Sequence, residues 1–370
     1  MHRYARTFII LLLLSTLGPA ACGAPDETET VAPPAAATAA PSATPAPPAP
    51  SPTPFPTPTS TPLPPTPTPP PAATPSVQPP IGTKPPTPTA TPGLTLPGYP
   101  PNTMGDILVL EYHVIGEPEG RWSRTPDNFR ADMEYLLAHG YYPVNLIDVV
   151  RRNLGQVPRG RRPVVLTFDD STEGQFRTLD DGSPDPRSAA GILKAMHDQY
   201  GADWPLRATF FVLLDADTPG PLLFGQEASG PQKVQTLAGW GMEIGSHTIR
   251  HLDMGAAAPE TIAWELAVSQ NRIEALIPGH AVRSLSVPYG GYPADISLLK
   301  EGDVQAEGLH YRYEAAVKVG GEPAPSPFSP HFDPYLIPRV QAIQTELDHW
   351  LGYYEQYPER YYVSGGGAGN

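Results

Sequence analysis

The sequence contains a single cysteine, Cys22, among 370 residues, so no disulfide can form within the chain. Basic residues are also scarce, because 24 lysines and arginines stand against 38 aspartates and glutamates, and the net charge is −14. This balance argues against nucleic acid or an anionic membrane surface as the main partner and favours a neutral or cationic one. The apolar run of residues 8–14 is too short to span a bilayer as a helix.

Residues 1–22 predict a secretion signal, with a positively charged start, the apolar run and small residues before Cys22. The segment "PAAC" resembles the lipobox of bacterial lipoproteins, although Pro19 replaces the usual aliphatic residue. Lipidation of Cys22 would give an extracellular, cell-surface lipoprotein anchored to the bacterial membrane. The alternative is plain secretion after Ala21, which leaves a spare thiol. In both cases the membrane is a partner only through the N-terminus.

Proline is concentrated at one end of the chain, since 30 of the 52 prolines lie in the first 101 positions. Residues 23–103 are rich in Pro, Thr, Ala and Ser and predict a disordered tether of about 3.1 Å per residue when extended. The tether reads either as a passive spacer or as a device that holds a domain away from the membrane. Residues 104–363 predict one folded domain, and residues 364–370 a Gly-rich disordered tail.

After the tether, strand-like and helix-like segments alternate. Short apolar runs predict strands at 107–113, 142–150, 162–168, 207–214, 242–247 and 282–290. Helical spacing and capping residues predict helices at 125–140, 186–201, 231–241 and 259–278, the first capped by Thr125 or Asp127 and stopped by Gly140. This alternation is typical of an α/β fold with a parallel sheet, either a barrel or a doubly wound sheet.

Chemistry in such folds gathers at the carboxyl ends of the strands. The expected ends carry Tyr112-His113, Asp169-Asp170, His247 with His251, and Pro288-Tyr289-Gly290. We therefore expect these residues to converge on one mouth.

The segment "SHTIRH" places His247 and His251 four residues apart, so both imidazoles can reach one metal ion. A carboxylate from another strand would complete three ligands and leave a position open for water, as in catalytic zinc sites. A packed or solvated histidine pair is the alternative. An aspartate pair at a strand end can likewise be a loop cap. Together the two signals favour a metal site.

The motifs "LTFDD", "SHTIRH" and "VPYG", in this order, resemble the first three motifs of the polysaccharide deacetylase family, carbohydrate esterase family 4 with the NodB homology domain. The resemblance extends over roughly residues 106–300, including "LVLEYHVI" and "RATFFVLL". It implies a distorted (β/α) barrel of about seven parallel strands. It also implies metal-dependent removal of N- or O-acetyl groups from a polysaccharide.

Carried over by position, the resemblance makes Asp170, His247 and His251 the ligands of a divalent metal ion, most often Zn²⁺, with Co²⁺ or Ni²⁺ as alternatives. Asp169 would be the catalytic base, and the backbone amide of Tyr289 would stabilise the oxyanion. The candidate substrate-binding residues are His113, Pro288, Gly290 and Arg339. His113 could orient substrate at the mouth or support the first strand.

Two positions depart from the family pattern. The arginine that orients the base is replaced by Ser286, for which Arg283 or Arg339 could substitute. The general acid is usually a histidine in a Leu-x-His motif, which "LDHW" matches with His349. Because the apolar spacing around His349 is helical and turns that residue away, we favour His331, in a Pro-rich loop, as the acid.

The resulting hypothesis is a hydrolase, expected to be a monomer, that deacetylates a polymer of N-acetylglucosamine. The alternatives are an esterase of the acetylxylan type and a catalytically silent carbohydrate-binding or wall-anchored module. The long segment 171–188, directly after the aspartate pair, either shapes a sugar cleft or has no role.

Overall fold

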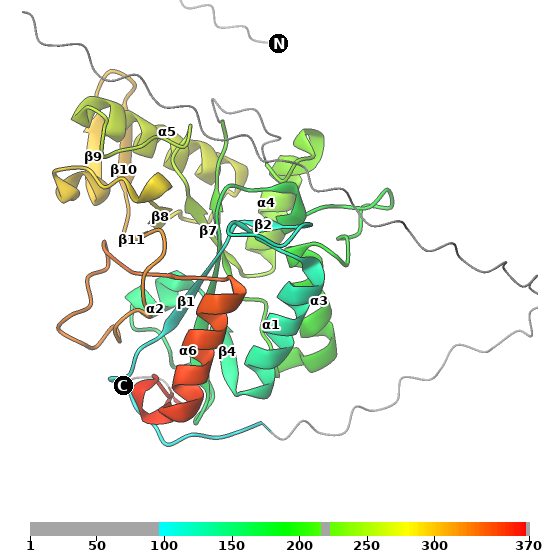
Figure 1. Cartoon of the computed structure of the whole chain (residues 1–370). Coiled ribbons are helices and arrows are strands. Elements are labelled where there is room, and N and C mark those ends of the chain that lie inside the picture. Colours follow the sequence, from blue (N-terminus) through cyan, green and yellow to red (C-terminus); the bar gives the residue numbers. More distant parts are fainter. Residues whose placement is uncertain (1–95, 216–222, 368–370) are drawn as a thin grey trace, which may run out of the picture. The chain divides into compact units, whose positions relative to one another are not determined.

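The computed structural model describes residues 96–215 and 223–367 of the chain. The predicted signal, Cys22 and most of the predicted tether lie outside the described residues. The strands are β1 (Leu108–Tyr112), β2 (Val114–Ile115), β3 (Ser123–Arg124), β4 (Tyr141–Val144), β5 (Arg162–Phe168), β6 (Thr209–Val212), β7 (Glu243–Ser246), β8 (Ser284–Ser286), β9 (Glu301–Val304), β10 (Leu309–Arg312), β11 (Ala315–Val317) and β12 (Val340–Gln341). The helices are α1 (Pro126–Ala138), α2 (Leu146–Val150), α3 (Ala189–Tyr200), α4 (Gly230–Gly239), α5 (Pro259–Leu276) and α6 (Gln344–Gln356) (Figure 1).

The main sheet runs in the order β11-β8-β7-β6-β5-β1-β12, and β4 pairs with the first half of β5. All of its strand pairs are parallel. An isolated parallel bridge between Val317 of β11 and Ile337, which precedes β12, joins the two ends of this path. The arrangement confirms the predicted distorted (β/α) barrel with about seven parallel strands.

Burial explains why these segments form strands. All seven residues of β5 and all five of β1 are buried, because helices cover the outside of the sheet and side chains fill its inside. Helix α1 begins as predicted, since the Thr125 hydroxyl accepts a hydrogen bond from the Asn128 amide at 3.2 Å. Gly140, with φ of 77°, ends that turn. None of the helices in the described ranges is long and apolar enough to cross a membrane.

The predicted strand over 142–150 is only half correct, because β4 ends at Val144 and α2 follows. Asn145 takes an extended conformation ahead of α2, and the carboxylate of Glu243 accepts a hydrogen bond from the Ile147 amide at 2.9 Å. This tertiary contact at the helix start overrides the strand preference of the Ile and Val residues. The antiparallel pair β9 and β10, inserted between β8 and β11, was not predicted.

Glu243 links three neighbouring strands at their amino ends, because it begins β7 and contacts the first residues of β6 and β8. Its carboxylate also accepts hydrogen bonds from Thr209 of β6 at 3.0 Å and from Ser284 of β8 at 2.6 Å. Burial raises the pKa of Glu243 above the ordinary value, although these hydrogen bonds lower it.

The folded part reaches beyond the predicted bounds of 104 and 363. Asn102 bridges Val363, and the Arg162 guanidinium lies 3.6 Å from the centre of the Tyr99 ring. At the other end, Ser364 is buried and its amide donates to the Arg161 carbonyl at 2.9 Å. Residues on both sides of the predicted domain thus pack on the barrel.

Candidate active site

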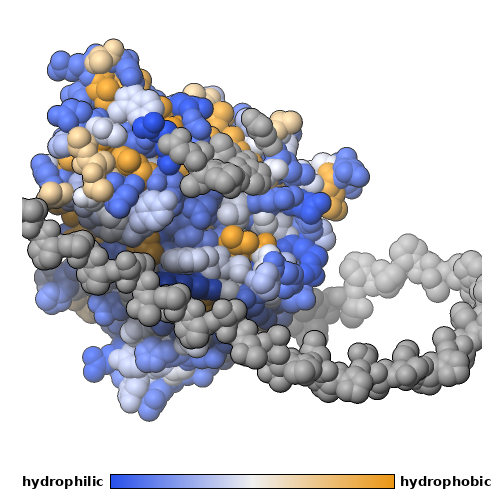
Figure 2. Space-filling model, turned by 45° about the horizontal axis from the view of Figure 1, so that its top comes forward, coloured by the Kyte–Doolittle hydropathy of each residue, from blue (hydrophilic) through white to orange (hydrophobic). Residues whose placement is uncertain are grey.

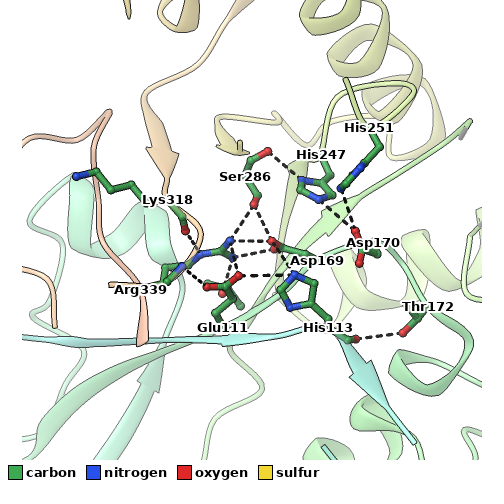
Figure 3. A network of polar contacts seen from close by, with 12 residues as sticks. Glu111, His113, Asp169, Asp170, Thr172, His247, His251, Ser286, Lys318 and Arg339 are labelled. Atoms are coloured by element: carbon green, nitrogen blue, oxygen red, sulfur yellow. Dashed lines mark hydrogen bonds and ion pairs between the residues drawn. The ribbon is translucent and has the colours of Figure 1, made fainter. Parts of the chain in front are cut away.

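Three predicted metal ligands meet at the carboxyl ends of β5 and β7. Asp170 follows β5, His247 follows β7, and His251 lies in the loop after His247 (Figure 3). Asp170 Oδ1 lies 3.2 Å from His247 Nε2 and 3.5 Å from His251 Nε2. His247 is buried, whereas Asp170 and His251 are half-buried. One side of the cluster is therefore open to a ligand.

These distances fit a shared metal ion. Zinc bonds to imidazole nitrogen and carboxylate oxygen are about 2.0–2.2 Å long, so neighbouring ligand atoms around a tetrahedral ion lie about 3.3 Å apart. The potential ligand atoms of the three side chains all lie within 4.8 Å of one another. Two imidazoles and one carboxylate are also a donor set that suits Zn²⁺ and leaves a coordination position for water.

A hydrogen bond fixes the orientation of the His247 ring. Its Nδ1 lies 2.9 Å from the Ser286 carbonyl oxygen, which can only accept, so Nδ1 carries the proton. The unprotonated Nε2 then faces Asp170 and is free to bind a metal ion. The sheet itself supplies this support, because Ser286 ends β8, the neighbour of β7.

The loop that carries His251 is held by helix α5. The buried carboxylate of Glu265 accepts hydrogen bonds from the amides of Ile249 and Arg250, each at 3.0 Å. Its other oxygen accepts from Arg250 Nε at 2.6 Å. Because Glu265 ties the middle of the loop, the two imidazoles face the same point, and their ring centres lie 4.7 Å apart.

Burial and neighbouring charges shift the pKa values of the three side chains in the cluster. Burial raises the pKa of Asp170, but the hydrogen bond and charge of His247 outweigh it and lower that pKa below its ordinary value. Burial lowers the pKa of His247, but Asp169 and Asp170 raise it above the ordinary value. Burial and the neighbouring His247 lower the pKa of His251 to about 4, so its imidazole is neutral and available as a ligand near neutral pH.

Asp169, the predicted base, is fully buried and held by Arg339. Arg339 Nη1 donates to Asp169 Oδ1 at 2.8 Å, and Nη2 donates to Oδ2 at 2.7 Å. The Ser286 hydroxyl also donates to Oδ2 at 2.8 Å. Arg339 therefore supplies the guanidinium that the family pattern places at the position of Ser286. Arg283, the other candidate, pairs with Glu274 and Glu314 instead.

Arg339 is shared by two buried carboxylates. Its Nη2 lies 3.3 Å from Glu111 Oε1, and Glu111 Oε2 accepts a hydrogen bond from the Gly320 amide at 2.6 Å. Burial alone would raise the pKa of Asp169, but the guanidinium of Arg339 holds it well below its usual range. Asp169 is thus ionised at any working pH.

His113 lies beside the buried pair, directly after β1. Its Nε2 is 3.9 Å from Asp169 Oδ2 and 3.6 Å from Glu111 Oε1 (Figure 3). The hydroxyl of Thr172 and the amide of Gln175 both donate to the His113 carbonyl, at 3.1 and 2.6 Å. Glu111, His113 and Asp169 are close enough to hold a metal ion, but Arg339 already occupies both carboxylates.

Backbone strain concentrates at this site. Among the described residues, eight other than glycine have positive φ, and five of them belong to the site or its loops: Asp170, Ser171, Thr248, His251 and Tyr289. Such conformations cost free energy and persist where the surrounding structure enforces them, commonly at functional sites. Tyr289, with φ of 58°, projects its ring outward, and the ring centre lies 4.4 Å from that of His251.

The site opens into a cavity of about 490 Å³. Its lining consists of His113, Val114, Arg121, Trp122, Asp169, Asp170, His247, His251, Tyr289 and Val319. Large apolar side chains are seldom exposed elsewhere, and the surface in Figure 2 shows mostly hydrophilic residues with separate apolar patches. Three of the six exposed large apolar residues in the described ranges, Val114, Trp122 and Tyr289, line this cavity.

Several other predicted residues occupy different places. His331 is exposed, its amide donates to the Ser329 hydroxyl, and it is not part of the described cavity lining. The Pro-rich loop turns its side chain to solvent. His349 is exposed on α6, as its helical spacing predicted. Arg339 is fully buried and cannot contact substrate, because the two carboxylates enclose its guanidinium.

Pro288 and Gly290 flank Tyr289 in a single turn after β8. Pro288 is buried and Gly290 is exposed with φ of 69°, a value that suits glycine. The segment 171–188 contributes none of the described cavity lining. Its buried Gln175 instead donates to the carbonyls of His113 and Asp169, so this segment supports the ends of β1 and β5.

Sequence reasoning missed Glu111, Arg121 and Trp122. A glutamate within the apolar run "LVLEYH" was a signal of a buried charge that needs a partner. No comparable signal identified Arg121 and Trp122, because they lie in an irregular loop whose course follows from tertiary packing.

Comparison with known proteins agrees with the site. Residues 156–306 match the family model described as polysaccharide deacetylase. A chitooligosaccharide deacetylase from Bradyrhizobium sp. (strain ANU 289) is 27% identical over 147 residues, which are 40% of this chain and 54% of that protein. A chitooligosaccharide deacetylase from Sinorhizobium fredii (strain NBRC 101917 / NGR234) is 26% identical over 147 residues, 39% of this chain and 55% of that protein. The chain thus spans about half the length of these curated relatives.

Among solved structures, a polysaccharide deacetylase from Bacillus cereus aligns with a TM-score of 0.47 and 20% identity, covering 64% of this chain and 65% of that one. The fold and the site define an α/β barrel with a candidate metal centre formed by two histidines and a carboxylate. Within this fold, residues 156–306 are similar to the polysaccharide deacetylase family.

Proposed function

We propose that this protein is a metal-dependent hydrolase that removes acetyl groups from an N-acetylated polysaccharide built on N-acetylglucosamine. The observation that carries the proposal is that a candidate metal site and a fixed carboxylate lie side by side at the carboxyl ends of the barrel strands. Asp170, His247 and His251 form an open three-ligand cluster, and Asp169, fixed by Arg339, lies immediately before the first of these ligands.

The bound divalent ion, most plausibly Zn²⁺ on its donor set, would lower the pKa of a coordinated water to about 7 and polarise the acetyl carbonyl. Asp169 accepts the proton of the attacking water through the lone pairs that Arg339 and Ser286 leave free. Because Arg339 binds both of its oxygens, the carboxylate cannot rotate away from the site. The low pKa of Asp169 keeps this base ionised while substrate binds.

His113 delivers a proton to the leaving amine nitrogen. It lines the cavity beside Asp169, its side chain is 14% exposed, and its Nε2 lies 3.9 Å from Asp169 Oδ2 and 3.6 Å from Glu111 Oε1. We propose His113 in place of His331, which lies outside the cavity. The backbone amide of Tyr289, in a strained turn at the mouth, donates to the developing oxyanion.

The test is acetate release from N-acetylchitopentaose and from acetylated xylan by the metal-stripped protein, before and after Zn²⁺ is restored. Metal-dependent release from the amide substrate is the expected result. Release from xylan alone would reassign the protein as an ester hydrolase. No release from either substrate, at one bound metal ion per chain, would overturn the proposal. Asp170→Asn is the matched control, because it removes a metal ligand with little change in volume.

We also propose that the protein acts outside the cell as a lipoprotein, with Cys22 as the acylated residue and the membrane contacted only through this anchor. The sequence "PAAC" after an apolar run supports this assignment. Metabolic labelling with an alkyne-bearing fatty acid should mark the full chain and not the Cys22→Ser variant. Labelling that survives this substitution, or none in either chain, would exclude the anchor.

A further inference from the structure

Arg121 and Trp122 lie together on the rim of the active-site cavity, in the loop of residues 116–122 that joins β2 to β3. Trp122 is 42% exposed, and its ring centre lies 4.7 Å from that of His113. The guanidinium carbon of Arg121 lies 4.9 Å from the centre of the Trp122 ring. This stacking holds a positive charge next to the residue that we propose as the acid.

Arg121 has no carboxylate partner in the described part of the chain. The two acidic residues of its own loop are paired elsewhere, since Glu119 binds Arg124 at 2.6 Å and Glu117 lies 3.3 Å from Arg187. Arg121 therefore lines the cavity with a positive charge that no carboxylate among the described residues neutralises. This contrasts with Arg339, whose guanidinium two carboxylates enclose.

When a divalent metal ion is bound, the other charges of the site cancel and the charge of Arg121 remains unbalanced. Glu111, Asp169 and Asp170 supply three negative charges, which Arg339 and one divalent metal ion balance. Arg121 then leaves the cavity net positive, although the chain as a whole carries −14. Local charge in a cavity outweighs distant surface charge, because exposed charges beyond about 10 Å are screened at 0.1 M salt.

Resting on the function proposed above, we propose that Trp122 and Arg121 form a sugar subsite that selects an acidic polysaccharide. Trp122 offers exposed aromatic surface for a sugar ring, and the exposed ring of Tyr289 lines the same cavity. Arg121 binds a carboxylate on the sugar next to the one that is deacetylated. The substrate class is therefore a polymer in which N-acetylglucosamine alternates with, or itself carries, a carboxylate. This proposal departs from the expectation of a neutral or cationic partner that was drawn from the net charge.

The test measures binding by calorimetry to the Zn²⁺-loaded Asp169→Asn protein, which keeps the metal ion and the net positive cavity but lacks the base needed for turnover. The neutral probe is N-acetylchitopentaose, and the acidic probe is a hyaluronan oligosaccharide of similar length, in which glucuronate alternates with N-acetylglucosamine. We expect the acidic probe to bind several-fold tighter, up to about tenfold, and this preference to shrink as salt is raised. Arg121→Gln should remove the preference and leave binding of the neutral probe unchanged.

The matched control is Arg159→Gln, which makes the same charge change before β5 begins, at the opposite end of that strand from the cavity. It should keep the preference. Trp122→Ala should weaken the binding of both probes about tenfold. Trp122→Phe should recover much of this affinity because it retains an aromatic ring. Equal affinities for the two probes in the Asp169→Asn protein, or a preference that survives the addition of Arg121→Gln, would overturn the proposal, as would the absence of binding to both probes.

Acetate release from the same two probes, measured with Zn²⁺ present, separates this proposal from the proposed function. Release without an acidic preference in binding contradicts the subsite alone. A preference that depends on Arg121 without release of acetate supports the subsite and contradicts the hydrolase.

Discussion

Arg339 donates two parallel hydrogen bonds to Asp169, at 2.8 and 2.7 Å, and both side chains are completely buried. The pair joins the end of β5 to the loop before β12, two segments far apart in sequence. Bidentate pairing fixes the carboxylate in orientation as well as charge. Asp169 therefore has an orienting guanidinium although a serine, Ser286, stands where the resemblance places an arginine.

Arg339→Met is expected to lower kcat by at least about 100-fold, because it removes the group that orients Asp169. It should also lower the free energy of unfolding by about 3–5 kcal/mol, since a buried carboxylate loses its partner. Steady-state kinetics and urea unfolding measure the two effects. Arg339→Lys keeps the charge but not the paired donors. It should unfold at a urea concentration between those of the wild-type protein and Arg339→Met. Full activity in Arg339→Met would show that Asp169 needs no orienting partner.

Ser286→Arg is expected to destabilise the protein, although it restores the family pattern. Ser286 is fully buried, and its hydroxyl lies 3.1 Å from Arg339 Nη2, so a second guanidinium would crowd the first. The double variant Ser286→Arg with Arg339→Ser relieves this clash and should recover part of the activity. Thermal unfolding and acetate release of the two variants and the wild-type protein provide the check. A stable, active single variant would contradict the steric argument.

His113→Gln is expected to reduce kcat by about 100- to 10,000-fold while metal affinity stays unchanged, because His113 acts on the leaving group and is not a ligand. Metal titration and steady-state kinetics separate these two effects. His331→Gln and His349→Gln are matched controls with exposed histidines and should retain full activity. Loss of activity in His331→Gln with His113→Gln unaffected would reverse the assignment.

Glu243→Gln is expected to stabilise the protein more as pH rises. A carboxyl whose folded pKa lies above its unfolded value contributes stability below that unfolded value, here about 4.5, and loses it as pH rises through the folded pKa. Glutamine avoids the burial of a charge: its oxygen accepts from Ile147 and Thr209, and its amide donates to the Ser284 hydroxyl, which accepts in place of donating. Melting temperatures from about pH 4 to pH 7 measure the difference. The exposed Glu134→Gln is the control, and a gap that does not grow with pH would refute the argument.

The sequence predicted the barrel and the metal cluster because both are local patterns. Asp170 and His247 follow buried strands, and parallel strands place their ends at one edge of the barrel. Asp169 was found for the same reason. The role of Arg339 could be offered only as one of two alternatives, because its pairing depends on how a long loop crosses the barrel interior.

The exposed position of His331 could not be predicted, because sequence gives no direction for a Pro-rich loop. His113 was correctly placed at the mouth, yet its proximity to Asp169 follows from the pairing of β1 with β5, where Tyr112 faces Phe168. Neighbouring strands in a barrel cannot be deduced from their order along the chain when other strands lie between them in sequence, as β4 does here.

The central claim is that Asp170, His247 and His251 hold one metal ion on which acetate release depends. The most direct measurement titrates Zn²⁺ into the metal-stripped protein and records bound metal and acetate release from N-acetylchitopentaose in parallel. The account predicts one high-affinity site per chain, activity that rises in proportion to its occupancy, and loss of both in His251→Ala. Release that is independent of metal, or unaltered by His251→Ala, would contradict it.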